Sequence, residues 1–140
     1  MVWFKIIMQN IGIVIQARTN STRLPGKIFE NLDDKTVIEW IIKRLKRSKI
    51  KNIILATGSS KKDLELKKIC NQENIKFFRG SEKNVLKRYI DAAKKFEINH
   101  IVRITADCPF SDPSIIDFLI KKYFKGNYDY ASNVNPPTFP

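Results

Sequence analysis

Four β-type segments alternate with four helical patterns along this chain, and that alternation limits its possible folds more than any other feature. Short apolar runs rich in β-branched residues predict strands that are buried on both faces. Apolar side chains at helical spacing, such as Ile38, Ile41, Ile42 and Leu45, predict helices with one buried stripe. The expected strands are 11–17, 52–57, 76–79 and 101–105, and the expected helices are 36–47, 62–73, 82–96 and 113–124.

Successive strand–helix units predict an α/β fold: a Rossmann-like, three-layer arrangement with a mainly parallel sheet and right-handed crossovers. The chain has 140 residues and is 43% apolar, which suits a single domain with a substantial core. Ligands of such sheets bind outside the carboxyl ends of the strands. We therefore expect the functional residues in the loops that follow the four strands.

The C-terminal segment does not complete this pattern. Residues 128–133 could begin a fifth strand, but the chain stops at Pro140 without a closing element. Pro136 and Pro137 disfavour a further helix there. We expect residues 1–140 to be the nucleotide-binding part of a single domain, with its C-terminal part missing.

The net charge of +12 raises the alternative of a basic nucleic-acid-binding protein. Lysine supplies 19 of the 26 basic residues, and these lie singly or in pairs rather than in one long tract. We therefore do not expect nucleic acid as a partner. A scattered positive charge also suits a polyphosphate substrate.

Compartment signals point to the cytoplasm and away from a membrane. The N-terminal stretch 1–8 is interrupted by Lys5 and lacks a signal-peptide cleavage site, and no apolar run is long enough to span a bilayer. Cys70 and Cys108 belong to no paired-cysteine motif, so neither a disulfide framework nor a zinc site is expected.

Arginines are few in this lysine-rich chain, so an arginine is a candidate for a position that needs a planar, bidentate donor. The alternative is that they are ordinary surface cations. Five of them fall in or beside expected strand ends and turns: Arg18, Arg23, Arg79, Arg88 and Arg103.

The loop 16–27 after the first expected strand is the strongest candidate site. It carries three cations, three hydroxyl side chains and a Pro-Gly turn. It matches neither a Walker A loop nor a GxGxxG fingerprint. Hydroxyls and backbone N–H groups that donate to phosphate oxygens, together with Arg18 and Lys27, would suit a polyphosphate.

This loop resembles a known family. Ala17-Arg18 followed by Ser21-Thr22-Arg23-Leu24-Pro25-Gly26-Lys27 is similar to the signature of the cytidylyltransferases that activate acidic sugars, including acylneuraminate and ketodeoxyoctonate cytidylyltransferases. The spore-coat polysaccharide biosynthesis proteins of the F type are the most similar group. The similarity continues at residues 78–81, 85–86, 88–89, 103–109, 129–130 and 132–133.

The resemblance implies transfer of a nucleotidyl group, with CMP favoured, from a nucleoside triphosphate to a sugar acceptor. Pyrophosphate is released, and the product serves surface polysaccharide or glycan synthesis. Arg18 and Lys27 take the catalytic role of stabilising charge on the phosphates, while Arg23 shares that role or braces the loop. Asp107 takes the position of a Mg²⁺ ligand, although an Asp-Cys-Pro turn also suits a local cap. The implied nucleotide-binding residues are Ala17, Arg18, Ser21, Arg23, Lys27, Thr57, Arg79, Ser81 and Arg88.

Alternatives remain open at this point. GTP is a possible donor in place of CTP, and the chain is alternatively a catalytically inactive fragment that only binds nucleotide. The second half of family members usually supplies a further acidic metal ligand, much of the acceptor pocket and the dimer contacts, so a homodimer is possible. We expect structural roles for His100 and Cys108, and a helix-capping role for Asp112.

Overall fold

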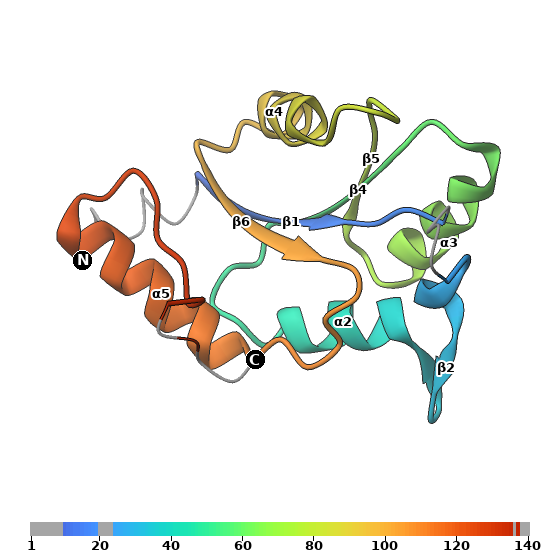
Figure 1. Ribbon diagram of the computed structural model, residues 1–140, viewed down its shortest axis with the longest axis horizontal. Helices are drawn as coiled ribbons and strands as arrows, with labels where there is room; N and C mark the ends of the chain where they lie inside the picture. The colour runs from blue at the N-terminus through green and yellow to red at the C-terminus, as the bar shows by residue number, and fades with distance from the viewer. Residues whose placement is uncertain (1–9, 20–23, 136, 138–140) are drawn as a thin grey trace.

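The computed structural model describes residues 10–19, 24–135 and 137. In these residues four parallel strands form one sheet with the order β5-β4-β1-β6 (Figure 1). The expected α/β class and the parallel sheet are confirmed. The strands are β1 (Ile11–Gln16), β4 (Ile53–Thr57), β5 (Lys76–Arg79) and β6 (His100–Thr105).

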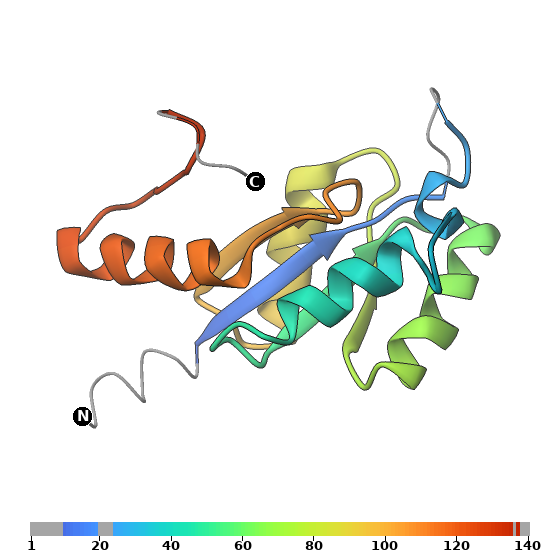
Figure 2. The ribbon, with the colours of Figure 1, turned by 90° about the horizontal axis from the view of Figure 1, so that it is seen from below.

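Helices cover both faces of the sheet, which gives the expected three layers. Helices α2, α3 and α5 lie side by side on one face, and α4 covers the other (Figures 1 and 2). A two-stranded hairpin and two 3₁₀ helices complete the connections. The helices are α2 (Val37–Leu45), α3 (Glu65–Gln72), α4 (Val85–Lys95) and α5 (Pro113–Gly126); the smaller elements are η1 (Lys27–Phe29), η2 (Lys61–Leu64), β2 (Asn31–Leu32) and β3 (Lys35–Thr36).

Polar caps set where three of the helices begin. The Thr36 hydroxyl and the Glu39 side chain form a capping box at α2. Asn84 accepts a hydrogen bond from the Lys87 N–H at 2.8 Å, so α4 begins at residue 85, three residues later than expected. Asp112 accepts one from the Ser114 N–H at 2.7 Å, which confirms its capping role.

The expected helix 62–73 is instead two elements. Its first turn is the 3₁₀ helix η2, and the α-helix begins only at Glu65. The tighter first turn places Asp63, which is buried, against the loop that follows β1.

The core has two parts, one on each face of the sheet, and β1 contributes side chains to both. Ile11, Ile13 and Ile15 pack toward α2, α3 and α5, whereas Val14 packs toward Tyr89 of α4. All four of these β1 side chains are at most 1% exposed. This double burial explains the unbroken apolar run in the sequence.

The segment 128–133, which could have begun a fifth strand, forms no strand in the described residues. This segment follows α5, and Tyr128 and Tyr130 are exposed. The described part of the chain contains no strand that pairs with it; the nearest β contact is an isolated bridge between Val134 and Pro137. A polar segment without a neighbouring strand has no partner for its backbone groups and stays irregular. No helix in the described ranges has the length and apolar content needed to cross a membrane.

The two cysteines lie in opposite environments, which gives a first prediction. Cys70 belongs to α3 and is fully buried, and burial raises the pKa of its thiol to about 12, whereas Cys108 is exposed. The thiolate is the reactive form. In native protein at pH 8 we expect one thiol per chain to react rapidly with a disulfide reagent, and the second only after unfolding. A Cys108→Ser variant should lose the rapid phase; rapid labelling of that variant would contradict the buried position of Cys70.

Candidate active site

The carboxyl ends of the four strands meet at one edge of the sheet. Gln16 of β1 aligns with Ala56 of β4 and with Thr105 of β6, and Thr57 aligns with Arg79 of β5. The loops that leave these positions therefore converge, as Figure 1 shows for the ends of β1 and β6. The expected location of the site, in loops after the strands, brings together residues from four separate parts of the chain.

Lys27 and Asp107 form the central contact of this edge, although 80 positions separate them in the sequence. The Lys27 Nζ donates a hydrogen bond to Asp107 Oδ2 at 2.9 Å, and the side chains are 35% and 48% exposed. Hydrogen bonds from Lys27 and then Thr105 hold the pKa of Asp107 below its usual range. A basic and an acidic group that both remain accessible to solvent can engage a phosphate and a cation together.

Backbone geometry places Lys27 for this contact. Gly26 adopts φ +75°, a left-handed conformation that favours glycine. Its N–H donates to the Thr19 carbonyl at 3.0 Å, which fixes the two ends of the loop relative to each other. Lys27 then opens the 3₁₀ helix η1.

Ala17 and Arg18 follow β1 directly. Ala17 is buried, and its N–H donates to the Ala56 carbonyl at 3.1 Å, so it continues the sheet. The Arg18 side chain is exposed, and it has no hydrogen-bond partner among the described residues. Its charge is close enough to Arg88 to lower the pKa of that guanidinium. Arg18 is thus an available cation at the edge where the phosphates are expected.

Arg88 lies inside α4, not at a strand end as expected, and its side chain is only 1% exposed. Its Nε and Nη2 donate to the Ser81 carbonyl at 2.9 and 2.6 Å, and Nη2 also donates to the Glu82 carbonyl at 3.0 Å. Desolvation by burial is the main cause that lowers its pKa. These contacts hold the loop after β5; contact with a nucleotide stays a prediction.

The loops after β4 and β5 are also tied to each other. Arg79 Nη2 donates to the carbonyls of Ser59 and Ser60, and the Glu82 carboxylate accepts the Ser59 N–H at 2.7 Å. A Cβ on Gly58 would overlap that carboxylate, so a larger residue at this position would force the Glu82 side chain to move. Arg79 therefore braces the loop after β4 in this structure, and its predicted contact with nucleotide is untested.

The other predicted residues are placed as follows. Thr57 is fully buried, and its hydroxyl has no hydrogen-bond partner among the residues that the structure describes; the half-buried Ser81 hydroxyl accepts the Asn84 N–H at 3.1 Å. Ser21 and Arg23 lie outside the described residues.

Arg103 is in the middle of β6, aligned with Val14, and not at a strand end as expected. His100 lies at the other end of β6, where Nδ1 is 3.3 Å from the Tyr123 hydroxyl, in keeping with a structural role.

Sequence reasoning missed Asp63, the buried acidic residue of η2. Its Oδ1 accepts hydrogen bonds from the Thr19 N–H at 3.1 Å and from the Thr19 hydroxyl at 2.6 Å. Asp63 is 1% exposed. A lone aspartate after Lys61-Lys62 gave no signal in the sequence, because only the fold shows that it is buried.

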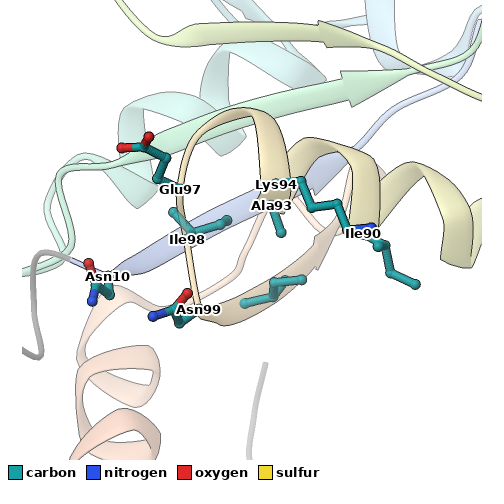
Figure 3. Close-up of a pocket in the computed structure, with 8 residues that line it drawn as sticks. Asn10, Ile90, Ala93, Lys94, Glu97, Ile98 and Asn99 are labelled. Atoms are coloured by element: carbon teal, nitrogen blue, oxygen red, sulfur yellow. The ribbon is translucent and has the colours of Figure 1, made fainter.

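One groove of the described structure does not coincide with these residues. A groove of about 600 Å³ opens between the end of α4 and the beginning of β1 and β6, lined in part by Ile90, Ile98 and Ile101 (Figure 3). Asn10 and Asn99, which also line it, precede β1 and β6 and mark it as lying at the amino edge of the sheet. The charged and hydroxyl groups described above lie at the opposite, carboxyl edge of the sheet. We therefore assign the candidate site from these side chains and not from the position of the groove.

The groups around Asp107 can be compared with the ligands that Mg²⁺ usually takes. Mg²⁺ usually takes one or two protein carboxylates, with phosphate oxygens and water completing its shell. Lys27 occupies Asp107 Oδ2, Thr105 also forms a hydrogen bond with the carboxylate, and the Cys108 thiol makes a weak contact with Oδ1 at 3.7 Å. The described residues contain no group of three potential ligands. The set fits a magnesium ion shared with a phosphate substrate, not one held by protein alone.

Comparison with known proteins identifies the family of the chain. Residues 12–139 match the model of the cytidylyltransferase family. A spore coat polysaccharide biosynthesis protein, SpsF of Bacillus subtilis, is 33% identical over 93% of this chain and 56% of its own length. An uncharacterized protein of Methanocaldococcus jannaschii is 43% identical over 91% of this chain and 53% of its own length.

A solved structure extends the likeness to three dimensions. A cytidylyltransferase from Leptospira borgpetersenii matches with a TM-score of 0.80 and 38% identity, over 83% of this chain and 49% of that one. The chain thus spans about half the length of the curated relatives it matches. The resemblance expected from the loop 16–27 is confirmed, and the chain belongs to the cytidylyltransferase family.

Proposed function

We propose that this chain carries the nucleotide-binding site of an enzyme that transfers a cytidylyl group from CTP to a sugar. The observation that carries the proposal is the Lys27–Asp107 pair at the carboxyl edge of the sheet, in a chain of the cytidylyltransferase family. This edge is where α/β sheets bind their ligands. Membership of the cytidylyltransferase family supports CTP as donor, and the polysaccharide role in the name of SpsF supports a sugar acceptor.

In the proposed reaction a hydroxyl oxygen of the sugar forms a bond to the α-phosphorus of CTP. The bond from this phosphorus to the bridging oxygen of the β-phosphate breaks, the hydroxyl proton is released, and pyrophosphate leaves with the bonding electrons. Negative charge grows on the phosphates during this exchange. Arg18 and Lys27 supply fixed positive charge at that point, which lowers the barrier because it needs no reorganisation.

Magnesium is part of the proposal. Asp107 is the residue that would hold it, and the ion would neutralise triphosphate charge. Lys27 holds the Asp107 side chain in place by its hydrogen bond at 2.9 Å. Residues Arg79, Glu82 and Arg88 keep the neighbouring loops together, which fixes the shape of the edge that receives the nucleotide.

A thermal-shift panel tests the proposal. ATP, CTP, GTP and UTP are compared with and without Mg²⁺, and inorganic triphosphate serves as the control for charge alone. A ligand at 100 times its dissociation constant stabilises the folded state by about 2.7 kcal/mol. We expect a shift with CTP that requires Mg²⁺ and exceeds the shift with triphosphate. A selective GTP shift would name the guanylyl alternative, and no shift with any nucleotide would contradict the proposal.

The same panel separates nucleotide binding from nucleic-acid binding. A basic nucleic-acid-binding protein would show little preference among mononucleotides, and its affinity for duplex DNA would fall steeply with salt. We expect the preference among nucleotides to persist at 200 mM salt.

Asp107→Asn gives a second prediction. The amide keeps the shape of the side chain but is a poor ligand for a hard cation. We expect CTP affinity in the presence of Mg²⁺ to fall at least about tenfold, because the charge that holds the ion is lost, and affinity without Mg²⁺ to change little. Isothermal titration at several Mg²⁺ concentrations measures both.

The matched control is Asp91→Asn. Asp91 pairs with Lys87 on α4 at 2.9 Å, so this variant removes a similar surface pair outside the site. Pairs this exposed contribute about 1 kcal/mol or less to stability, so both variants should stay folded. Identical magnesium titrations for Asp107→Asn and the wild type would remove Asp107 from the metal site.

A further inference from the structure

Asp63 makes a contact that the proposed reaction does not use. Its carboxylate comes from η2, after β4, and binds Thr19 in the loop after β1, 44 positions away. One oxygen, Oδ1, receives both the N–H and the hydroxyl of Thr19. The hydroxyl contact, at 2.6 Å, is short, as expected for a charge-assisted hydrogen bond.

Thr19 is held from both sides by this arrangement. Its N–H and hydroxyl bind Asp63, and its carbonyl accepts the Gly26 N–H at 3.0 Å. Gly26 directly precedes Lys27, whose ammonium reaches Asp107. A continuous series of contacts thus runs from the buried carboxylate to the cation expected to bind phosphate.

Arg18 is also fixed by this contact. It lies between Ala17, whose N–H binds the sheet, and Thr19, whose N–H binds Asp63. Its backbone is therefore restrained on both sides, and its exposed side chain leaves from a defined point. The two cations of the proposed mechanism share Thr19 as their common support.

The burial of Asp63 shows that the contact is costly to maintain. The side chain is 1% exposed, and its second oxygen, Oδ2, is buried with no hydrogen-bond partner in the described structure. Burying a carboxylate with one unpaired oxygen opposes folding, so this residue is an unfavourable choice for stability alone. Asp63 and Glu82 are the acidic groups whose charges act on the buried Arg88, which offsets part of that cost.

We propose that Asp63 is a positioning residue: through Thr19 it sets the loop that presents Arg18 and Lys27 to the nucleotide phosphates. This inference rests on the proposed function, because its effect is measured as nucleotide affinity. A purely structural contact would change the free energy of unfolding and leave the affinity of the folded protein unchanged.

Thr19→Val and Thr19→Ser form the test pair. Valine keeps the size of the side chain and the backbone N–H but removes the hydroxyl that binds Asp63, whereas serine keeps the hydroxyl. We expect Thr19→Val to weaken CTP binding in the presence of Mg²⁺ about tenfold, the effect of one charge-assisted hydrogen bond. Thr19→Ser should bind within about threefold of the wild type.

Ser48→Ala is the matched control for stability. Ser48 is 1% exposed, and its hydroxyl donates to the Ile50 carbonyl at 3.2 Å in the connection before β4, at the amino edge of the sheet. This variant also loses one buried hydroxyl contact, but far from the loop. We expect it to unfold at a lower urea concentration, as Thr19→Val does, and to bind CTP as the wild type does.

Amide hydrogen exchange tests the contact without any nucleotide. In the wild type the Thr19 amide should exchange slowly, and Asp63→Ala should speed this exchange at least tenfold while the Val14 amide of β1 stays protected. Wild-type protein that binds no nucleotide, with a protected Thr19 amide, would refute the proposed function and leave the contact intact. Equal CTP affinity in Thr19→Val and the wild type, where the wild type does bind, would overturn the positioning role.

Discussion

Lys27→Ala is expected to lower the rate of pyrophosphate release from CTP by about 100-fold or more. Removing one donor that stabilises charge in a transition state typically costs a factor of about 100 to 1,000. The Lys27 ammonium is the cation that the fold holds beside Asp107, at 2.9 Å. CTP affinity in the presence of Mg²⁺ should fall as well, since the same ammonium meets the ground-state triphosphate. A coupled pyrophosphate assay and a binding titration measure the two effects.

Lys121→Ala is the control for this change. Lys121 is exposed on α5, remote from the loop 16–27, so the variant loses one charge without touching the site. Both variants have the same net charge, which separates a local effect from a change in the field of the whole protein. Equal CTP affinity and equal rates in the two variants would remove Lys27 from the site.

The difference in stability between the wild type and Lys27→Ala should shrink as pH falls. The pKa of Asp107 is lowered in the folded protein, chiefly by its hydrogen bond from Lys27. A lowered pKa contributes stability above the unfolded value, and this contribution is lost as pH falls through the folded value. The free energy of unfolding of the wild type should therefore be slightly larger than that of Lys27→Ala near pH 7. The two free energies should converge below about pH 4, the usual range for the pKa of aspartate. Because the pair is exposed, the difference should stay within about 1 kcal/mol.

The sequence predicted the layers, and the edge at which the candidate residues meet, because both depend on local patterns. The apolar run of β1 and the helical stripes of α2 and α4 are visible without tertiary information, and strand direction then fixes where loops meet. The meeting of Lys27 and Asp107 follows from this logic, since β1 and β6 are neighbours in the sheet. The family signature supplied the residue types.

The framework around the site was not predictable in the same way. Asp63 and Arg88 are polar residues that the fold buries, and nothing local distinguishes them from solvated charges. Their partners lie in other loops and are backbone groups apart from the Thr19 hydroxyl, so they carry no sequence signal. The split of the helix expected at 62–73 into η2 and α3 has the same cause: the contact of Asp63 with Thr19 is a tertiary interaction.

Arg88→Ala should destabilise the fold by about 2–4 kcal/mol. This variant tests whether Arg88 supports the framework of the site or binds the nucleotide directly. The side chain is 1% exposed, and its loss leaves the Ser81 and Glu82 carbonyls without the hydrogen bonds it donates and removes a positive charge that interacts with Asp63. Urea unfolding measures the change from the midpoint and slope. The control is Arg44→Ala: Arg44 also donates to a backbone carbonyl, that of Ser111 at 3.0 Å, but it is only half-buried and should cost about 1 kcal/mol.

The two roles of Arg88 predict opposite patterns in stability and binding. A framework residue lowers the unfolding midpoint strongly, and the protein that remains folded loses CTP affinity only as far as the loop after β5 shifts. A residue that contacts phosphate directly loses affinity while stability stays near that of the wild type. The three donated hydrogen bonds, all to backbone carbonyls of residues 81 and 82, favour the first pattern. Wild-type stability with abolished CTP binding would instead place Arg88 on the nucleotide, as the family resemblance alone implied.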